Sequence, residues 1–565
     1  MKSHLIHQKR EFADVRQLME WAGDTHGEKI AFSYRNKAGD KAVQSVSFET
    51  LRKDVRNLAS RLREMGCEGK HCAVIGSFSY DWVLAYYAVL ICGGVLVPLD
   101  RDWKGEDLAA TAKEAKVELL FCDKDIAEKA SAVEESTRLL CPTLWLKGGA
   151  EEHSLQCLTA EGEAVYRTSP QLYHDAPTDP HRMALLVYTS GTTGAGKGVM
   201  LSQTAVLSNI CAALPYIDYS EKTVAVLPPH HTYGSTVMLI GHTVIGSEVY
   251  ISSGLRHIQR ELAEQKPGHM VLVPLYLETF YRKILANAKE QGKEKLLRRM
   301  IRISNLLRKV GIDLRKKLFG SVRKAFGGEL RTVISGGAPI SHEIVSFFDS
   351  IGIATLNGYG ITECAPLIAV NRSRYRVQDS VGHVIEIDTV KIDAPDENGE
   401  GEILVKGPNV MLGYYQKEEA TAEAVDKEGF FHTGDYGRLR KDGVLFITGR
   451  KKNLIILSNG KNVYPEEIES ALSSLPGVLE TGVYEGISKR GTEHNAIVAE
   501  IFPDTEYLKK NGITDAYAYL KEHINDYNRT ATPYKKIGVL KVRTEEFPKN
   551  TLRKILRFRL DMSID

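Results

Sequence analysis

Hydroxyl, glycine and lysine residues gather in one short segment that follows an apolar, strand-like run. After Leu186–Tyr188 the chain reads TSGTTGAGKG, which spans residues 189–198. Glycine lets the backbone approach a phosphate and turn its N–H groups toward it, and the Ser and Thr hydroxyls add further donors. Lys197 adds a compact positive charge that suits a polyphosphate. The segment therefore predicts a phosphate-binding loop.

The same segment nearly fits a second kind of phosphate loop. Gly191 to Lys197 matches the pattern G-x-x-x-x-G-K of P-loop proteins, but the next residue is Gly198, where that motif needs Ser or Thr to hold magnesium. A P-loop also belongs to the first strand of its domain, whereas at least two strand–helix units precede this segment. A P-loop nucleotide switch is therefore the disfavoured alternative.

Seven further motifs follow the loop in order, and together with it they resemble the adenylate-forming superfamily of acyl-CoA synthetases, luciferases and peptide-synthetase adenylation domains. The motifs are LPPHHTYG (Leu227–Gly234), ISGGAP (Ile334–Pro339), NGYGITE (Asn357–Glu363), HTGD (His432–Asp435), GRKKN (Gly449–Asn453), NGKNVYPEEIE (Asn459–Glu469) and PKNTLRK (Pro548–Lys554). Gly196 stands where the superfamily usually has proline. The basic segment ahead of GGELRTVISGGAP makes the chain most similar to bacterial long-chain fatty-acyl-CoA synthetases.

The resemblance implies an ATP-dependent reaction in two halves. A carboxylate attacks the α-phosphorus of ATP, which gives an acyl-adenylate and pyrophosphate, and a thiol then attacks the acyl carbon and releases AMP. The implied cofactors are ATP and Mg²⁺, with coenzyme A as cosubstrate and an acyl carrier protein as the alternative acceptor. Because the first half-reaction brings anions together, the site must position and neutralise charge.

The matched motifs imply which residues bind the nucleotide and its metal. The β- and γ-phosphates are expected at Thr189, Ser190, Gly191, Thr192, Thr193, Gly194 and Lys197. Thr362 is expected at the α-phosphate, and Glu363 is the expected magnesium ligand because a hard cation prefers carboxylate oxygen. The adenine is expected against Gly336, Gly337, Ala338, Asn357, Gly358, Tyr359 and Gly360, with the Tyr359 ring stacked on its face. The ribose is expected at Asp435 and Arg450.

The resemblance also implies residues that act through the C-terminal part of the chain. Lys554 matches the lysine that bridges the carboxylate and the α-phosphate. Arg553 stands where many relatives have glycine, and Lys549 is a nearby alternative. Lys452 matches a hinge between two domains, and Gly460 is expected beside the tunnel for the pantetheine arm of coenzyme A.

The residues after His231, which is expected near the acyl channel, favour an apolar substrate. Val237, Met238, Leu239 and Ile240 follow without a charged residue that could pair with a second carboxylate or an amino group. An apolar tube suits a linear acyl chain, whose burial contributes about 0.8 kcal/mol per CH₂. We therefore expect a medium- to long-chain fatty acid, with an aryl acid as the alternative.

The elements that must position these residues alternate between strands and helices. Apolar runs such as His71–Gly76, Leu185–Thr189 and Val224–Leu227 lie between helical patterns, which is typical of parallel sheets covered by helices. After about residue 380, shorter strands with turn signals predict a β-rich, antiparallel subdomain that ends near residue 448. We expect an α/β fold with a large domain at residues 1–451, a small mobile α+β domain at residues 452–565, and the hinge at Lys452.

Composition limits the partners and the location. The 565 residues include 74 Lys and Arg against 72 Asp and Glu, and a net charge of +2 gives no reason to expect nucleic acid. The eight cysteines show no metal-ligand spacing, and the N-terminus MKSHLIHQKREF lacks the apolar core of a signal peptide. Trp82–Leu99 is uncharged, but Gly93, Gly94 and Pro98 interrupt it, so a buried helix–turn–strand is favoured over a membrane span. A cytoplasmic protein is expected.

One segment, Lys293–Lys324, is strongly basic, with twelve Lys and Arg against Glu294 and Asp313. Apolar residues recur in it near helical spacing, at Leu296, Leu297, Met300, Ile303, Leu306 and Leu307. This pattern predicts basic amphipathic helices. Either they pack on the core with a solvated basic face, or they lie on the anionic inner face of a membrane, where an acyl substrate would be collected. A membrane-surface scaffold without catalysis is a further rival hypothesis.

Overall fold

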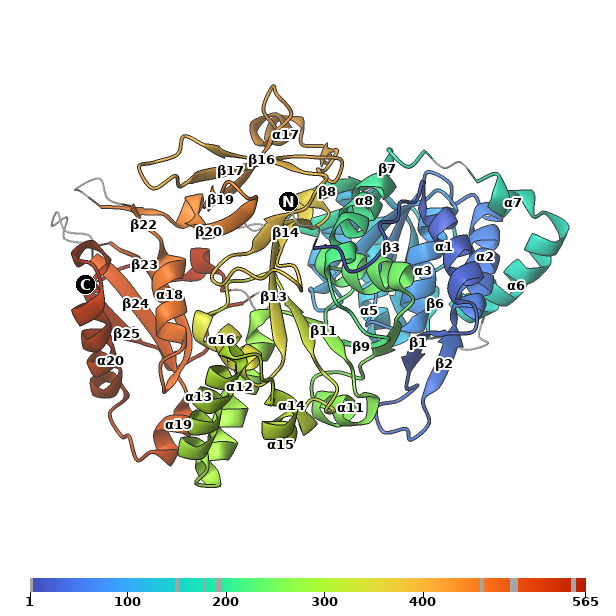
Figure 1. Ribbon diagram of the computed structural model, residues 1–565. Helices are drawn as coiled ribbons and strands as arrows, with labels where there is room; N and C mark the ends of the chain where they lie inside the picture. The colour runs from blue at the N-terminus through green and yellow to red at the C-terminus, as the bar shows by residue number, and fades with distance from the viewer. Residues whose placement is uncertain are drawn as a thin grey trace.

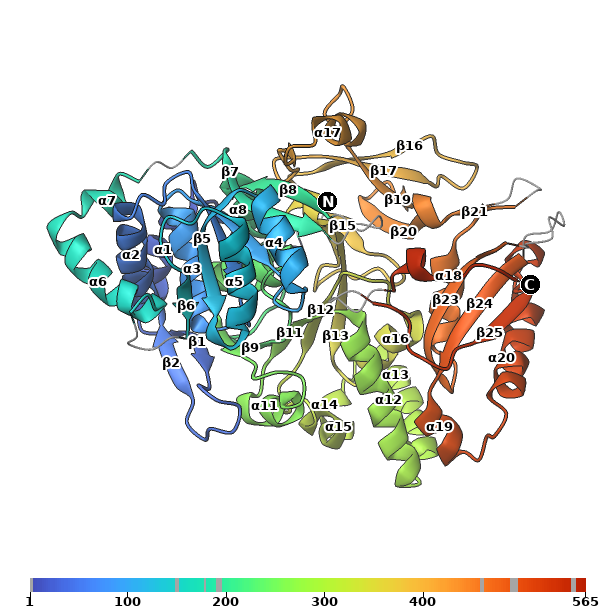
Figure 2. The ribbon, with the colours of Figure 1, turned by 180° about the vertical axis from the view of Figure 1, so that it is seen from behind.

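The sheets and helices of the computed structural model divide into a large N-terminal part and a smaller C-terminal unit (Figures 1 and 2). The structure describes residues 4–147, 152–176, 179–189, 196–457, 462–487, 496–549 and 555–564. Helices lie on the faces of the mainly parallel sheets of the large part, as the alternation of strands and helices predicts. The expected α/β fold class is therefore confirmed.

A seven-stranded sheet in the described residues carries the glycine-rich segment at one edge. Its strand order is β18-β8-β7-β4-β3-β5-β6, parallel from β7 to β6 and antiparallel at β8 and β18. The bounds are β3 (His71–Ile75), β4 (Val95–Leu99), β5 (Val117–Asp123), β6 (Leu144–Leu146), β7 (Met183–Thr189), β8 (Lys197–Ser202) and β18 (Gly413–Tyr414). Residues 82–99 form most of helix α3 (Tyr80–Ile91) and then β4, so the expected helix–turn–strand is confirmed.

Two further sheets hold the remaining strands of the large part, as far as the described residues go. The smaller has the order β2-β1-β10-β9, with β1 (Ile30–Tyr34), β2 (Gln44–Ser47), β9 (Lys222–Ala225) and β10 (Glu248–Ile251). The larger has the order β11-β12-β13-β14-β15-β20-β19-β17-β16. Its bounds are β11 (His269–Leu272), β12 (Thr332–Ser335), β13 (Ala354–Gly360), β14 (Leu367–Val370), β15 (Gly382–Val384), β16 (Thr389–Asp393), β17 (Gly401–Lys406), β19 (Phe431–Leu439) and β20 (Val444–Arg450).

The larger sheet changes character along its width. β11, β12 and β13 are parallel, whereas every pairing from β13 to β16 is antiparallel. The antiparallel strands expected after about residue 380 are therefore present, and they continue the sheet that β11–β13 begin. The end of β13 pairs with the next strand, β14, and the Tyr359 hydroxyl near that end donates to Asp435 on β19, much later in the chain.

The C-terminal unit has an apolar core of its own. β23 (Val478–Gly486), β24 (Ala496–Pro503) and β25 (Val539–Val542) pair in this order, and β21 (Ile455–Ile456) pairs with β22 (Asn462–Val463). Ile468, Leu472, Leu520 and Ile524 from its helices pack with residues of these strands in a cluster separate from those of the large part. This arrangement is the small α+β unit that the sequence predicts, while the exact domain boundary stays a prediction.

Helices complete both parts. They are α1 (Val15–His26), α2 (Phe48–Glu64), α3, α4 (Gly105–Glu114), α5 (Ala127–Ser136), α6 (Leu155–Thr168), α7 (Gln171–His174), α8 (Gln203–Ala213), α9 (Thr232–Ser235), α10 (His242–Ile245), α11 (Ile258–Gln265), α12 (Pro274–Glu290), α13 (Glu294–Lys309), α14 (Arg315–Leu318), α15 (Gly320–Lys324), α16 (His342–Ser350), α17 (Glu418–Ala424), α18 (Pro465–Ser473), α19 (Thr505–Lys510) and α20 (Ala516–Thr530). Among the described residues, no helix combines the length and the hydropathy that a membrane crossing requires.

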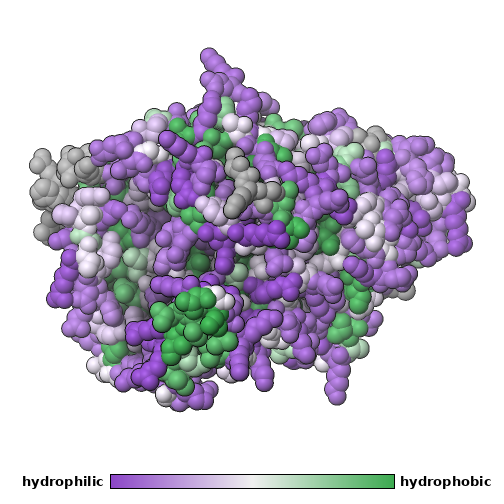
Figure 3. Space-filling model, in the orientation of Figure 1, coloured by the Kyte–Doolittle hydropathy of each residue, from purple (hydrophilic) through white to green (hydrophobic). Residues whose placement is uncertain are grey.

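The basic segment forms helices as expected, but its apolar residues do not all face the core. Leu297 and Ser304 are the buried residues of α13, whereas Leu296, Ile303 and Leu306 are exposed. Figure 3 shows a hydrophobic patch on the face of the molecule where α12 and α13 lie. The helical spacing predicts the helix correctly, but it cannot tell which part of a wide apolar stripe the fold covers.

Candidate functional site

The glycine-rich segment links two paired strands of the seven-stranded sheet. Thr189 ends β7 and Lys197 begins β8, and the two residues are partners in the antiparallel register. The Thr189 hydroxyl donates to the carbonyl of Lys197 at 3.4 Å. Ser190, Gly191, Thr192, Thr193 and Gly194 lie outside the described residues, so their expected phosphate contacts stay a prediction. The two flanking residues that the structure describes stand side by side at the base of the loop.

Tyr414 joins the loop lysine to the expected metal ligand. Its short strand, β18, pairs with β8, and the Nζ atom of Lys197 lies 4.4 Å from the centre of the Tyr414 ring. The Tyr414 hydroxyl donates to Oε1 of Glu363 at 2.9 Å, and the backbone N–H of Met411 donates to the Glu363 carbonyl at 2.8 Å. Burial, and then the charge of Glu363, raises the pKa of Tyr414 well above its ordinary value, so the hydroxyl stays a donor.

The surroundings of Glu363 fit a magnesium ion that substrate phosphates help to hold. Thr362 and Glu363 begin the short 3₁₀ helix η4 (Thr362–Cys364), directly after β13, and both are half-buried. Within the described residues, no group of three or more His, Cys, Asp or Glu side chains converges to form a metal cage. Mg²⁺ commonly binds through one or two carboxylates together with water and phosphate oxygens. A single half-buried carboxylate near Lys197 suits that arrangement.

Tyr359, Asp435 and Arg450 form a connected group beside the metal ligand. Asp435 on β19 faces Arg450 on β20 in the antiparallel register, and Nε of Arg450 lies 3.0 Å from Oδ1 of Asp435. The Tyr359 hydroxyl, from β13, donates to Oδ2 of the same carboxylate at 2.7 Å. The charge of Asp435 raises the pKa of Arg450, and Glu363 contributes in the same direction from farther away. The two halves of the site are therefore electrostatically coupled.

The Tyr359 hydroxyl donates to Asp435, and this contact affects the expected role of Tyr359 at the adenine. Burial raises the pKa of Tyr359 well above its ordinary value, with the charge of Asp435 next in importance, so the hydroxyl remains a donor to the carboxylate. The hydrogen bond involves only the hydroxyl, and the expected stacking of the ring on adenine stays a prediction. Asp435 itself is buried, and its expected contact with the ribose hydroxyls stays a prediction.

Glycines in this region keep space that side chains would fill. Gly336 follows β12, and a Cβ atom there would lie 3.2 Å from the Tyr233 ring. Gly337 has φ +86°, a conformation that favours glycine, and Gly337 and Ala338 are exposed beside it. At Gly360 a Cβ would stand 1.8 Å from the carbonyl oxygen of Pro366, so no larger residue fits. Asn357 and Gly358 continue β13 toward Tyr359 and make the expected surface for adenine continuous with the sheet.

The segment Leu227–Gly234, which contains His231, contacts the segment Ile334–Pro339 through Tyr233. His231 precedes α9, and the Tyr233 hydroxyl donates to the carbonyls of Leu272 and Ile334, at 3.2 Å each. The neighbouring His230 lies 3.6 Å from the buried carboxylate of Asp100, yet burial outweighs this charge and lowers the pKa of His230. His231 is half-buried, and α9 separates it from a π-helix, Thr236–Gly241, whose residues are nearly all buried.

Of the site residues predicted in the C-terminal part of the chain, some lie within the described residues and others do not. Lys452 is exposed in the 3₁₀ helix η5 (Lys451–Asn453), which directly follows β20. Lys554 and Gly460 lie outside the described residues, so both assignments stay predictions. Lys549, the alternative to Lys554, forms ion pairs with Glu480 and Glu546, and its side chain is largely buried. Those contacts are within the C-terminal unit itself.

Sequence reasoning missed three residues that hold the site together. Tyr414, in NVMLGYYQ (Asn409–Gln416), binds Glu363, and Tyr233 supports Gly336. Glu402 on β17 binds Lys451 at 2.6 Å and His432 at 3.3 Å. Burial alone would raise the pKa of Glu402, but these two hydrogen bonds outweigh it and lower this pKa. A tyrosine between apolar residues carries no chemical signal in a sequence, so only the strand pairing reveals Tyr414.

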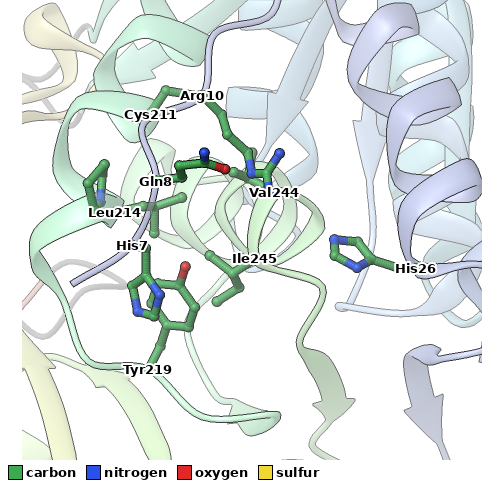
Figure 4. A pocket seen from close by; sticks show the side chains of 10 residues that line it. His7, Gln8, Arg10, His26, Cys211, Leu214, Tyr219, Val244 and Ile245 are labelled. Atoms are coloured by element: carbon green, nitrogen blue, oxygen red, sulfur yellow. The ribbon is translucent and has the colours of Figure 1, made fainter. Parts of the chain in front are cut away.

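A cavity of about 250 Å³ lies beneath the N-terminal segment, away from these residues. It is lined by His7, Arg10, His26, Tyr219 and six others, with the His7 ring stacked on that of Tyr219 (Figure 4). None of the motif residues lines it. This cavity is therefore separate from the candidate site.

Comparison with known proteins identifies related sequences. A family model described as "AMP-binding enzyme" matches residues 19–415. The long-chain-fatty-acid–CoA ligase FadD15 of Mycobacterium bovis is 29% identical over 451 residues, which cover 76% of this chain and 73% of that protein. Long-chain-fatty-acid–CoA ligase 5 of Mus musculus is also 29% identical, over 82% of this chain and 71% of its own length.

Solved structures share the fold across nearly the whole chain. ATP-bound MatB from Rhodopseudomonas palustris superposes with a TM-score of 0.75 at 24% identity, covering 96% of this chain and 97% of that one. O-succinylbenzoate coenzyme A synthetase from Bacillus subtilis, in complex with ATP and magnesium ion, has a TM-score of 0.71 at 20% identity, covering 96% and 98%. Both the large part and the small C-terminal unit therefore have counterparts in one known architecture.

Proposed function

Because the chain belongs to the AMP-binding enzyme family, we propose that it is an AMP-forming acid–thiol ligase. It activates a medium- to long-chain fatty acid with ATP and transfers the acyl group to coenzyme A, which gives acyl-CoA, AMP and pyrophosphate. The observation that carries this proposal is that residues from distant segments form two neighbouring groups. Tyr414 links Lys197 to Glu363, and Tyr359 and Arg450 hold Asp435. The charge of Glu363 helps to raise the pKa of Arg450.

The geometry supports separate binding roles for these residues around ATP. Lys197 neutralises charge on the β- and γ-phosphates, the hydroxyls of the loop donate hydrogen bonds to them, and Thr362 contacts the α-phosphate after the end of β13. Asp435 accepts the ribose hydroxyls while Arg450 and Tyr359 hold its carboxylate in place. The backbone of Gly336–Ala338 and the Tyr359 ring enclose the adenine. Each of these residues binds or orients charge, which is what attack of one anion on another requires.

Glu363 would hold magnesium, which supplies charge neutralisation to the polyphosphate when bound. Tyr414 donates to one oxygen of this carboxylate and so fixes the direction in which the other oxygen points. Lys554 would bridge the fatty-acid carboxylate and the α-phosphate. Lys549 is the weaker candidate for this role, because Glu480 and Glu546 already engage its ammonium group.

Support for a fatty acid comes from the chain and from its relatives. Helix α9 and the π-helix Thr236–Gly241 follow His231, are mostly buried and carry no charged side chain, which supports an apolar substrate. The curated relatives quoted above are named as long-chain-fatty-acid–CoA ligases. Lys452 would be the hinge about which the small unit turns between half-reactions, and Gly460 would border the path of the thiol. We place the enzyme in the cytoplasm, in peripheral contact with a membrane through Lys293–Lys324.

Acid-dependent exchange of labelled pyrophosphate into ATP tests this function directly. We expect exchange with fatty acids of medium to long chain, weak exchange with benzoate, and loss of exchange in Glu363→Gln. Supplying coenzyme A or acyl carrier protein to the preformed acyl-adenylate then identifies the acceptor. If ATP is hydrolysed without acid, or no acid supports exchange, the chain is not an acid-activating enzyme.

A further inference from the structure

The cavity beneath the N-terminal segment has room for a small organic molecule. Its volume is about 250 Å³, whereas an engineered cavity of about 150 Å³ in another protein holds benzene. Part of its lining is apolar and consists of Leu214, Pro215, Val244 and Ile245. These residues belong to α10 and to the 3₁₀ helix η2 (Leu214–Tyr216), which follows α8. The cavity therefore offers a surface on which an apolar group can pack.

Three polar side chains at the cavity have nitrogen atoms without a hydrogen-bond partner in the described part of the chain. Nε2 of His7 and Nε2 of His26 are buried, and neither atom is hydrogen-bonded. The Arg10 guanidinium lies 4.5 Å from the centre of the Trp21 ring, and no carboxylate of the described residues pairs with it. In Figure 4, His7 and Arg10 project from the N-terminal segment, and His26 lies across from them at the end of α1. Because buried polar atoms are nearly always hydrogen-bonded, these groups indicate that a further molecule completes the site.

The electrostatic environment of the cavity is positive. None of its ten lining residues is acidic, and Arg10 carries a permanent positive charge. Burial lowers the pKa of His26, and the charge of Arg10 adds a smaller contribution in the same direction. Burial raises the pKa of Tyr219 to about 12, and the charge of Arg10 opposes this rise. Arg10 therefore lies close enough to both rings to act on them, and a negatively charged group among these side chains would be stabilised.

We propose that this cavity is a binding site for a small organic carboxylate with a short apolar body. The planar guanidinium of Arg10 matches the two oxygens of a carboxylate, and an N–H at Nε2 of His7 or His26 adds a further donor. The apolar body packs against Val244 and Ile245. A metal ion fits poorly because Arg10 repels a cation, and inorganic phosphate would leave the apolar lining uncovered. The proposal does not depend on the proposed function, since none of the motif residues lines the cavity.

Titration of the full chain with hexanoate, without ATP, magnesium or coenzyme A, tests the proposal. Because Arg10 lies over the Trp21 ring, a carboxylate that binds Arg10 should change the fluorescence of Trp21. Trp21→Phe removes this signal and so identifies any response from hexanoate bound elsewhere, including at the expected acyl channel. Hexanol tests whether the carboxylate is needed, and inorganic phosphate tests whether the apolar body is needed.

Two variants probe the side chains that would hold the carboxylate. Arg10→Gln removes the charge and also alters the surroundings of Trp21, so its affinity is measured by calorimetry. The phase to compare is the one whose dissociation constant matches the fluorescence titration of the wild type. His7→Gln keeps Arg10 over Trp21 and is followed by fluorescence. Arg167→Gln, at an exposed arginine of α6, is the matched control, and thermal unfolding without ligand shows whether each variant is folded.

Hexanoate should give a saturable change in fluorescence, and hexanol and phosphate should each bind at least about tenfold more weakly. Arg10→Gln should lower the affinity for hexanoate by about 10- to 100-fold, as expected for the loss of a charged hydrogen bond, and His7→Gln by about 2- to 10-fold. Arg167→Gln should bind as the wild type does. The proposal is overturned if the wild type shows no saturable change, or if the signal persists in Trp21→Phe. Unchanged affinity in both Arg10→Gln and His7→Gln, or equally tight binding of hexanol or phosphate, would overturn it as well.

Discussion

Removal of one hydroxyl group, in Tyr414→Phe, tests how the site orients its metal ligand. The Tyr414 hydroxyl donates to Oε1 of Glu363 at 2.9 Å, and the aromatic ring lies under the ammonium group of Lys197. Phenylalanine keeps the ring and the apolar contacts of this buried side chain, so the substitution removes the hydrogen bond alone. Glu363 then loses the contact that directs its carboxylate.

The size of the effect follows from the nature of the bond. A hydrogen bond to a charged acceptor contributes roughly 1.5–3 kcal/mol, which corresponds to about 10- to 100-fold in an equilibrium constant. If Glu363 holds magnesium, this loss should appear as a rise of that order in the Mg²⁺ concentration needed for half-maximal activity. The maximal rate should largely recover at high Mg²⁺, because the carboxylate itself is still present.

The assay is acid-dependent pyrophosphate–ATP exchange, measured against free Mg²⁺ at saturating ATP and fatty acid. Tyr415→Phe is the matched control, because the neighbouring tyrosine contacts the His71 ring and its hydroxyl forms no hydrogen bond within the described residues. Thermal unfolding of both variants separates a loss of stability from a loss of metal affinity. An unchanged Mg²⁺ requirement in Tyr414→Phe, or an equal change in the control, would refute the assignment of Glu363.

Three further outcomes are expected. Lys554→Ala should nearly abolish adenylation but spare thioester formation from supplied acyl-AMP. Lys549→Ala should mainly lower the unfolding temperature, because it breaks ion pairs inside the C-terminal unit. The reverse pattern would exchange the two roles. Asp435→Asn should raise the KM for ATP by about 10- to 100-fold through loss of a charged hydrogen-bond acceptor, and a normal KM would remove Asp435 from the ribose site. Burial raises the pKa of Asp388 to about 7. Between about pH 4 and pH 7 the folded state therefore keeps a proton that the unfolded chain has released. The free energy of unfolding should fall as the pH rises through this range, by up to about 4 kcal/mol. Asp388→Asn should flatten that dependence in urea unfolding, and an unchanged slope would contradict it.

Much of the fold could be predicted because local patterns decide it. The glycine pair at residues 93 and 94 marks the turn between α3 and β4, whereas Pro98 lies within β4, and turn signals mark the antiparallel strands after residue 380. Sheet order could not be predicted in this way. Strand β15 pairs with β20, and β8 pairs with β18, although these segments lie far apart in the chain, and no local pattern encodes such pairings.

The residues of the candidate site likewise divide into those that the sequence could predict and those that it could not. Residues such as Lys197, Glu363 and Asp435 belong to motifs with recognisable chemistry, so the sequence could nominate them. Tyr414 and Glu402 act by holding other residues, and their types alone do not distinguish them from structural tyrosines and surface carboxylates. The apolar residues of α13 were visible as helical spacing, but their exposure depends on which side α16 covers.

The separate apolar core of the C-terminal unit has a calorimetric consequence. Ile468, Leu472, Leu520 and Ile524 pack with one another and with their own strands. Arg282, Lys289 and Glu290 of α12 contact Leu479, Asn511 and Lys510 of this unit by polar groups, and Tyr464 of the unit lies against Tyr436 of β19. Units with separate apolar cores are only weakly coupled in unfolding. Heating should therefore produce two unfolding transitions. The C-terminal unit should unfold first, with the small heat-capacity increment of a domain of about 110 residues, and the large part should unfold at a higher temperature.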